Sequence, residues 1–208
     1  MFIHEMFQQK PCVFSVEVFP PKKAGAAEET LYPVLRELCT LGPDYISVTY
    51  GAGGGTAGQS TAKIASYIKN GLHVEALAHL TCVNSTRVQV EETLTRLRED
   101  NVENVLALRG DINPDLPRRM DFLHASDLAK AIAQTGGFGV AGACYPEGHV
   151  ESPSLKADVE SLRYKAEAGV SHLITQLFFD NVSYYRFLNM ARKAGISLPV
   201  QAGIMPIV

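Results

Sequence analysis

Apolar residues in this chain follow two alternating patterns. Seven short runs are rich in β-branched residues and bounded by turn residues, which predicts strands at residues 12–19, 44–51, 75–82, 104–111, 139–146, 172–179 and 199–206. The stretches between them carry apolar residues three and four positions apart opposite a polar face, which predicts helices at residues 30–41, 61–70, 86–100, 125–136, 154–169 and 181–195. Boundary signals are Ser126 or Ser154 near a helix start and Gly169 or Gly195 at a helix end.

Strict alternation of strand and helix indicates parallel strands, in an open doubly wound sheet or in a (β/α)₈ barrel. Nearly uniform units without a switch in pattern favour the barrel, the α/β fold of the TIM-barrel class. A closed barrel has eight strands, and the pattern supplies seven. We therefore expect residues 1–208 to form one incomplete (β/α) barrel domain, truncated before its eighth strand or completed by another segment.

Composition narrows the range of partners and compartments. The chain has 208 residues, 46% of them hydrophobic, and its 19 basic and 22 acidic residues give a net charge of -3, which offers no electrostatic reason to bind nucleic acid or an anionic membrane. Apolar runs fall well short of the roughly 20 residues that span a bilayer. The four cysteines form no C-x-x-C pair, which predicts neither a disulfide framework nor a zinc ribbon and favours the cytoplasm.

Polar residues gather at the predicted carboxyl ends of the strands, where barrel enzymes carry their chemistry. They are Glu17, Thr49, His79, Arg109, Asp111, Tyr145, His149 and Gln176, with Gly110 between Arg109 and Asp111. Any one of them could be a hydrogen-bonded core residue or a helix cap. Because burying so many polar groups without function is costly, the set predicts a site at this end of the barrel.

Glu17 is the sharpest candidate in this set. It lies between valines in FSVEVF, so we expect a partly desolvated carboxyl whose pKa is raised toward neutrality, as a general acid requires. The alternative is an ion pair with a lysine or arginine such as Arg109. Asp111 would supply a second carboxylate at the same mouth.

Two other patterns indicate chemistry less strongly. GGGTAG, with Gly53, Gly55 and Gly58, matches a dinucleotide fingerprint, but it follows the second strand and lacks an acidic residue at the end of the next one. It remains a candidate anion-binding loop. A zinc set of His79, Cys82, Cys144 and His149 is disfavoured, because His79 and Cys82 are three apart on a strand and point to opposite faces.

Seven motifs occur in order on the successive strands: FSVEVFPPK, SVTYGAGGGT, AHLTC, NVLALRGD, YPEGH, ITQLFFD and GIMPI. Together they resemble the methylenetetrahydrofolate reductase family over nearly the whole chain. The resemblance implies a catalytic (β/α)₈ barrel that binds FAD, takes a hydride from NADH or NADPH and reduces 5,10-methylenetetrahydrofolate to 5-methyltetrahydrofolate. We also expect a homo-oligomer, with a partner subunit as a further candidate.

Carried over by motif, the resemblance gives residue roles. Glu17 would be the general acid that opens the imidazolidine ring of the folate, Asp111 would lie by the flavin and the pterin, and Gln176 would contact the folate. Flavin contacts are implied for Thr49, Ala52, His79, Arg109, Gly110, Asp111, Ala125, Tyr145, His149, Ser152, Asp158 and Lys165.

Two alternatives remain. A glycosidase could use Glu17 and Asp111 as its carboxylate pair, although the chain has no tryptophan to stack on a sugar. A non-catalytic or partner-dependent shortened barrel is the other, because members of the resembled family extend further and obtain an eighth strand and more substrate contacts from that extension.

Overall fold

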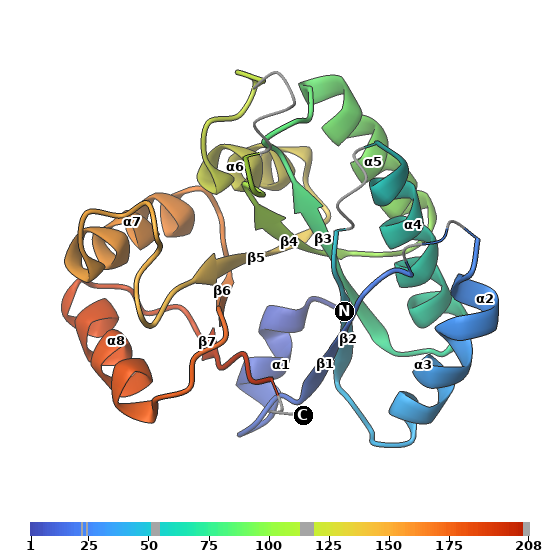
Figure 1. Ribbon diagram of the computed structural model, residues 1–208, viewed down its shortest axis with the longest axis horizontal. Coiled ribbons are helices and arrows are strands. Elements are labelled where there is room, and N and C mark those ends of the chain that lie inside the picture. Colours follow the sequence, from blue (N-terminus) through green and yellow to red (C-terminus); the bar gives the residue numbers. More distant parts are fainter. Residues whose placement is uncertain (22, 24, 51–54, 113–118, 206–208) are drawn as a thin grey trace.

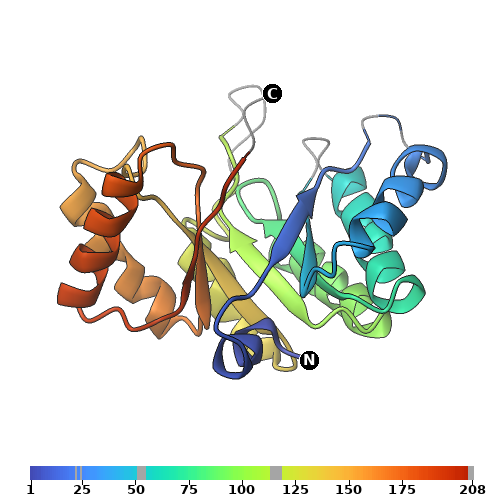
Figure 2. The same cartoon turned by 90° about the horizontal axis from the view of Figure 1, so that it is seen from below.

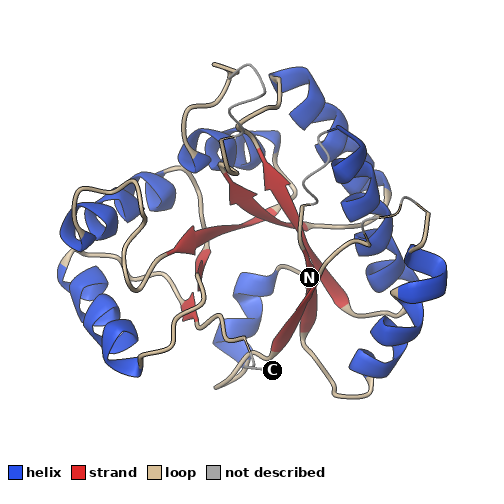
Figure 3. Ribbon diagram, in the orientation of Figure 1, coloured by secondary structure: helices blue, strands red, loops and turns tan. Residues whose placement is uncertain are grey.

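The computed structural model describes residues 1–21, 23, 25–50, 55–112 and 119–205, and for residues 55–57 only the backbone. Its centre is a curled parallel sheet with the strands in chain order (Figures 1 and 3). The strands are β1 Ser15–Val18, β2 Tyr45–Val48, β3 Glu75–Thr81, β4 Asn104–Leu108, β5 Gly139–Cys144, β6 His172–Thr175 and β7 Val200–Gln201. The prediction of seven strands in an incomplete TIM-type barrel is confirmed.

Helices cover the outer face of the sheet (Figure 3). They are α2 Ala27–Thr30, α3 Tyr32–Cys39, α4 Gly55–Ser66, α5 Arg87–Glu99, α6 Ala125–Thr135, α7 Leu155–Glu167 and α8 Asn181–Lys193, with a π-helical turn η1 at Tyr67–Gly71. Their apolar faces pack on outward-facing strand residues such as Ile46, Leu80 and Val105, all of them buried. This packing is the main hydrophobic core, and it explains the helical periodicity of the sequence.

Helix boundaries follow the sequence signals in part. The Ser154 side chain caps α7 by accepting a hydrogen bond from the Ala157 N–H, and Gly169 and Gly195 adopt positive φ angles of 98° and 81° just after their helices. Ser126 lies near the start of α6, as predicted, at the second residue of the helix. Asp127 stabilises this start, because its carboxylate accepts the N–H groups of residues 123 and 124, which precede the helix, at 2.9 Å.

The strands end earlier than predicted, and the freed residues form the mouth. β4 stops at Leu108, after which Gly110 takes a φ of +84°, and a Cβ there would lie 3.0 Å from the Cβ of Thr81. Only glycine fits this turn without strain. The backbone from Arg109 to Asp111 therefore leaves the sheet and crosses the carboxyl ends of the strands.

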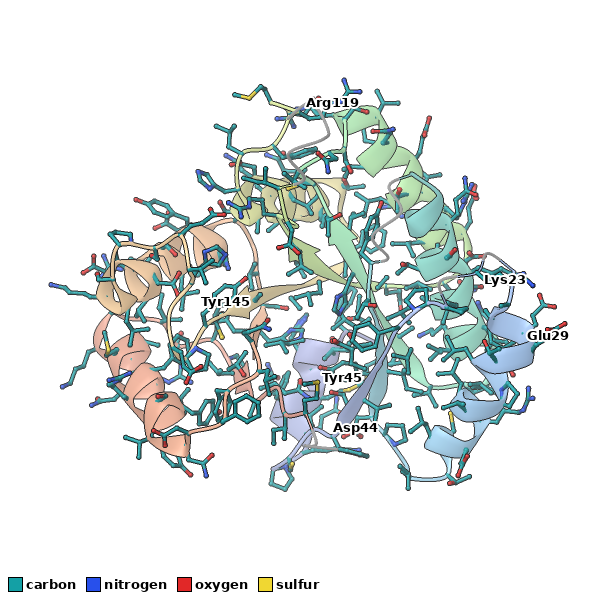
Figure 4. The ribbon with its side chains drawn as sticks, viewed as in Figure 1. Lys23, Glu29, Asp44, Tyr45, Arg119 and Tyr145 are labelled. Atoms are coloured by element: carbon teal, nitrogen blue, oxygen red, sulfur yellow. The ribbon has the colours of Figure 1, made fainter. Side chains whose placement is uncertain are left out.

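An additional helix, α1 Ile3–Gln9, closes the opposite end of the sheet (Figure 2). Ile3 and Met6 are buried against Tyr45, Leu77 and other residues that line the inside of the curled sheet. Figure 4 labels Tyr45 next to α1. The helix thus acts as an apolar plug at the amino ends of the strands.

β1 and β7 are the two edges of the sheet, and no backbone pairing joins them within the described residues. Side chains connect them instead. Gln201 of β7 donates from Nε2 to the Ser15 Oγ of β1 at 2.9 Å and accepts a hydrogen bond from the Tyr45 hydroxyl at 2.5 Å. This polar tie holds the curl of the sheet across its open side.

Candidate active site

The carboxyl ends of the strands surround one open cavity of about 2590 Å³. This volume exceeds the ~300–1,000 Å³ of typical small-molecule pockets. Every described candidate residue lines it, namely Glu17, Thr49, His79, Arg109, Gly110, Asp111, Ala125, Tyr145, His149, Ser152, Asp158, Lys165 and Gln176. Ala52 lies outside the described residues. The structure therefore brings residues from six strands and their loops to one mouth.

Glu17 lies in a hydrogen-bonded group with Ser47 and His79, which come from the next two strands. Glu17 and Ser47 are register partners, and their Oε2 and Oγ atoms lie 3.4 Å apart. The His79 Nε2 lies 2.7 Å from the same Ser47 Oγ and 3.4 Å from the Glu17 Oε2. The His79 side chain is 8% exposed and that of Glu17 47%, so a buried base of polar groups holds a carboxylate that faces the cavity.

The prediction of a raised pKa for Glu17 is wrong for this arrangement. Burial does act to raise it, but the hydrogen bond and charge interaction with His79 and the hydrogen bond from Ser47 act the other way, and the pKa of Glu17 is lowered overall. The sequence showed only the apolar neighbours along β1. The neighbours across the sheet reverse the direction of the shift.

Arg109 does not pair with Glu17 either. Its Nη1 and Nη2 donate to the two carboxylate oxygens of Glu151 at 2.5 and 2.7 Å. This bidentate pair raises the pKa of Arg109. Asp111 is exposed beside it, and its negative charge acts on Arg109 in the same direction.

The loop and helix after β5 supply a second polar group. Lys165 is partly buried and donates from Nζ to the Ala143 carbonyl at 2.5 Å, with the amino group 5.9 Å from the ring centre of Tyr145. Tyr145, labelled in Figure 4, meets His149 edge to face at 4.7 Å. Asp158 accepts the His149 backbone N–H at 3.3 Å.

Burial shifts the two charged residues of this group in opposite directions. It lowers the pKa of Lys165 and raises the pKa of Asp158. Both shifts favour the neutral form, because each charge is largely removed from water. A ligand that brings an opposite charge or a hydrogen bond would stabilise the charged form of either residue.

The remaining candidates lie around the same mouth. Gln176 is exposed just after β6, and its backbone N–H bonds the Cys144 carbonyl at 2.7 Å. Thr49 follows β2, with its N–H on the Val18 carbonyl at 3.0 Å. Ala125 begins α6 at the cavity rim.

The metal alternative finds no support among the described residues, which contain no group of three or more metal-ligating side chains. Cys82 is buried on the outer side of the sheet, opposite His79, as the strand spacing predicted. All four cysteines are free thiols, and burial raises the pKa of Cys82 and Cys144 to about 12. Of the glycine-rich motif, Gly53 lies outside the described residues, and Gly55 begins α4.

Sequence reasoning missed Ser47 and Glu151. The alternation in YISVT places Ser47 on the same face as Thr49, and pairing β2 beside β1 would have put it next to Glu17. Glu151 gave no comparable signal, because it lies in an irregular loop whose path no periodicity predicts.

A known protein family matches nearly the whole chain. The family model for methylenetetrahydrofolate reductase matches residues 2–208. The chain belongs to the methylenetetrahydrofolate reductase family. The resemblance read from the motifs is thereby confirmed.

Named relatives show how much of a family protein the chain spans. It is 38% identical to the 5,10-methylenetetrahydrofolate reductase of Pectobacterium carotovorum subsp. carotovorum, over 93% of the chain and 63% of that protein. The corresponding enzyme of Escherichia coli K12 is 36% identical over 93% of the chain and 64% of the relative. Methylenetetrahydrofolate reductase (NADH) 1 of Arabidopsis thaliana is 36% identical over 99% of the chain and 37% of its own length. The chain thus spans less than two thirds of each.

No helix among the described residues combines the length and apolar character needed to cross a membrane.

Proposed function

We propose that this chain carries out the reduction of 5,10-methylenetetrahydrofolate to 5-methyltetrahydrofolate, with FAD as cofactor and NADH or NADPH as hydride donor. The observation that carries the proposal is the group of Glu17, Ser47 and His79 at the cavity of a chain from this family. It provides a carboxyl group held in place by two neighbours and open to a ligand on one side.

The residues around the cavity fit a flavin dinucleotide. The cavity is large, and the guanidinium of Arg109 and the amino group of Lys165 place hydrogen-bond donors on it. Gly110 brings backbone close to the cavity where no side chain fits. When bound, FAD would supply the chemistry of accepting a hydride from the nicotinamide and passing it to the folate.

Glu17 would hold and then donate the proton that opens the folate ring. In the ligand-free chain its lowered pKa makes it a carboxylate at neutral pH. A folate ring lying over the exposed side of Glu17 would exclude solvent water from the carboxyl group. This strengthens the desolvation that raises a carboxyl pKa. Substrate binding therefore favours protonation of Glu17, while Ser47 and His79 keep Oε2 in position.

Asp111 and Gln176 complete the proposed folate contacts. Both are exposed at the mouth, so their polar groups are open to a ligand. A carboxylate and an amide suit a pterin ring, which has neighbouring hydrogen-bond donors and acceptors.

We also propose an oligomeric state and a cellular compartment for the enzyme. Residues 1–208 would form one catalytic barrel domain in a homo-oligomer, with a partner subunit as a further candidate. Four free thiols favour a reducing compartment such as the cytoplasm.

The test is flavin reduction and reoxidation on the purified chain. After loading with FAD under anaerobic conditions, the flavin absorbance should bleach when NADH or NADPH is added. It should return when 5,10-methylenetetrahydrofolate follows. A chain that binds no FAD, or whose reduced flavin persists with the folate, would contradict the proposal and support a non-catalytic barrel.

A further inference from the structure

The ion pair between Arg109 and Glu151 joins two parts of the cavity rim that are far apart in sequence. Arg109 comes directly after β4, and Glu151 lies in the loop between β5 and α7. The Arg109 side chain is 20% exposed and that of Glu151 50%, so the guanidinium is largely covered and the carboxylate stands at the edge. A bidentate pair of this kind fixes the plane of the guanidinium as well as its place.

Glu151 is itself tied to a candidate flavin contact. Its backbone N–H donates to the Nδ1 of His149 at 3.1 Å, and the His149 N–H is held by Asp158 at 3.3 Å. The Ser152 N–H closes the turn on the His149 carbonyl at 2.9 Å. The Glu151 carboxylate therefore links Arg109 to the loop that carries His149 and Ser152.

The pair leaves Arg109 able to bind a ligand. A guanidinium has five N–H groups. Nη1 and Nη2 each use one on Glu151, and Nε donates to the Gly110 carbonyl at 3.3 Å, so two remain without a partner among the described residues. Because Glu151 neutralises the positive charge, the pair offers directed hydrogen-bond donors rather than a bare cation.

We propose that Glu151 is a positioning residue for cofactor binding, which holds Arg109 and the 149–152 loop in the arrangement that receives the flavin. This inference rests on the proposed FAD function. It assigns Glu151 an indirect role, because the residue acts through Arg109. Its contribution is preorganisation, since binding then need not restrict a long flexible side chain.

The test measures the dissociation constant of FAD by quenching of flavin fluorescence for the unaltered chain and for Glu151→Gln, Glu151→Ala and Glu151→Asp. The constant should rise about 3- to 10-fold for Gln and Ala, the usual worth of holding one flexible side chain. Asp keeps the charge and should recover part of the loss. Glu147→Gln is the matched control, because Glu147 is exposed in the same loop and makes no ion pair within the described residues.

Each result decides a separate point. An unaltered chain that binds no FAD would count against the proposed function itself. If the chain binds FAD and the Glu151 variants bind it equally well, with or without a lower melting temperature, Glu151 is only structural and the inference fails. Tighter binding by Glu151→Gln and Glu151→Ala would also overturn it, because Glu151 would then compete with the cofactor for Arg109.

Discussion

The two ends of the curled sheet are built on opposite principles. At the amino ends of the strands, α1 inserts Ile3 and Met6 among apolar residues of the sheet interior. At the carboxyl ends, Glu17, Arg109 and Lys165 line an open cavity, and their charges are held by specific partners. One end supplies stability and the other carries costly polar groups, which the packing of the first end helps to offset.

Polar groups are present at the closed end as well, but they serve the plug. The Asn104 side chain accepts the Ile3 N–H at 2.9 Å and donates to the carbonyl of Met1 at 3.1 Å. These bonds satisfy backbone groups at the start of α1. The difference between the ends therefore lies in what the polar groups face: backbone at one end, open cavity at the other.

The largest expected effect comes from Glu17→Gln at the open end. Folate reduction should fall about 10²- to 10⁴-fold, the usual worth of a positioned general acid. Because Glu17 is half exposed and packs little, the melting temperature should change by only a few degrees. Steady-state kinetics and thermal unfolding on the same preparation check both expectations. A large loss of stability with retained turnover would show that Glu17 serves stability rather than catalysis.

Ile3→Ala at the closed end should do the opposite. Ile3 is fully buried, so its truncation should lower the free energy of unfolding by about 2–5 kcal/mol. The dissociation constant of FAD should stay unchanged under conditions where the variant is folded. Denaturant unfolding measures the loss, and Val88→Ala on the exposed face of α5 is the control, expected within about 0.5 kcal/mol of the unaltered chain. A small loss for Ile3→Ala would show that α1 is not a structural plug.

A smaller effect should come from acid acting on His172, which lies near α1. Burial, together with the charge of His4, lowers the pKa of His172 from 6.5 to about 4, and its ring lies 5.4 Å from that of Phe7. Between these two pH values the unfolded chain binds the proton and the folded chain does not. Stability should therefore fall as pH drops through that window, by about 2–3 kcal/mol between pH 7 and 4.5 from this residue.

The measurement is denaturant unfolding at pH 7 and 4.5 for the unaltered chain and His172→Asn. The variant should lose less stability on acidification by about that amount. His73→Asn, at an exposed position, is the matched control and should keep the slope of the unaltered chain. An equal slope in all three would mean that His172 is not held neutral by burial.

The sequence predicted the strands well and α1 not at all. The run VLAL is apolar throughout because both faces of β4 are buried, and that signal is local. Ile3, Met6 and Phe7 have helical spacing, but α1 has only 7 residues and depends on contacts with distant strands. Such a helix is stabilised by packing that cannot be seen along the chain.

The site shows the same limit. The position of Glu17 at the mouth followed from strand alternation, which is a local property. Its lowered pKa depends on Ser47 and His79 on neighbouring strands, and the place of Arg109 depends on Glu151 in an irregular loop. The sequence therefore identified most candidate residues, while their electrostatics required the fold.

The most direct test of the central claim, that Glu17 at the open end is the proton donor, is to measure the two half-reactions separately in Glu17→Gln by anaerobic stopped flow. Reduction of the bound flavin by NADH or NADPH should proceed at close to the rate of the unaltered chain, because that step opens no ring. Reoxidation by 5,10-methylenetetrahydrofolate should slow by about 10²- to 10⁴-fold. Equal slowing of both half-reactions, or no slowing of the second, would contradict the assignment of Glu17.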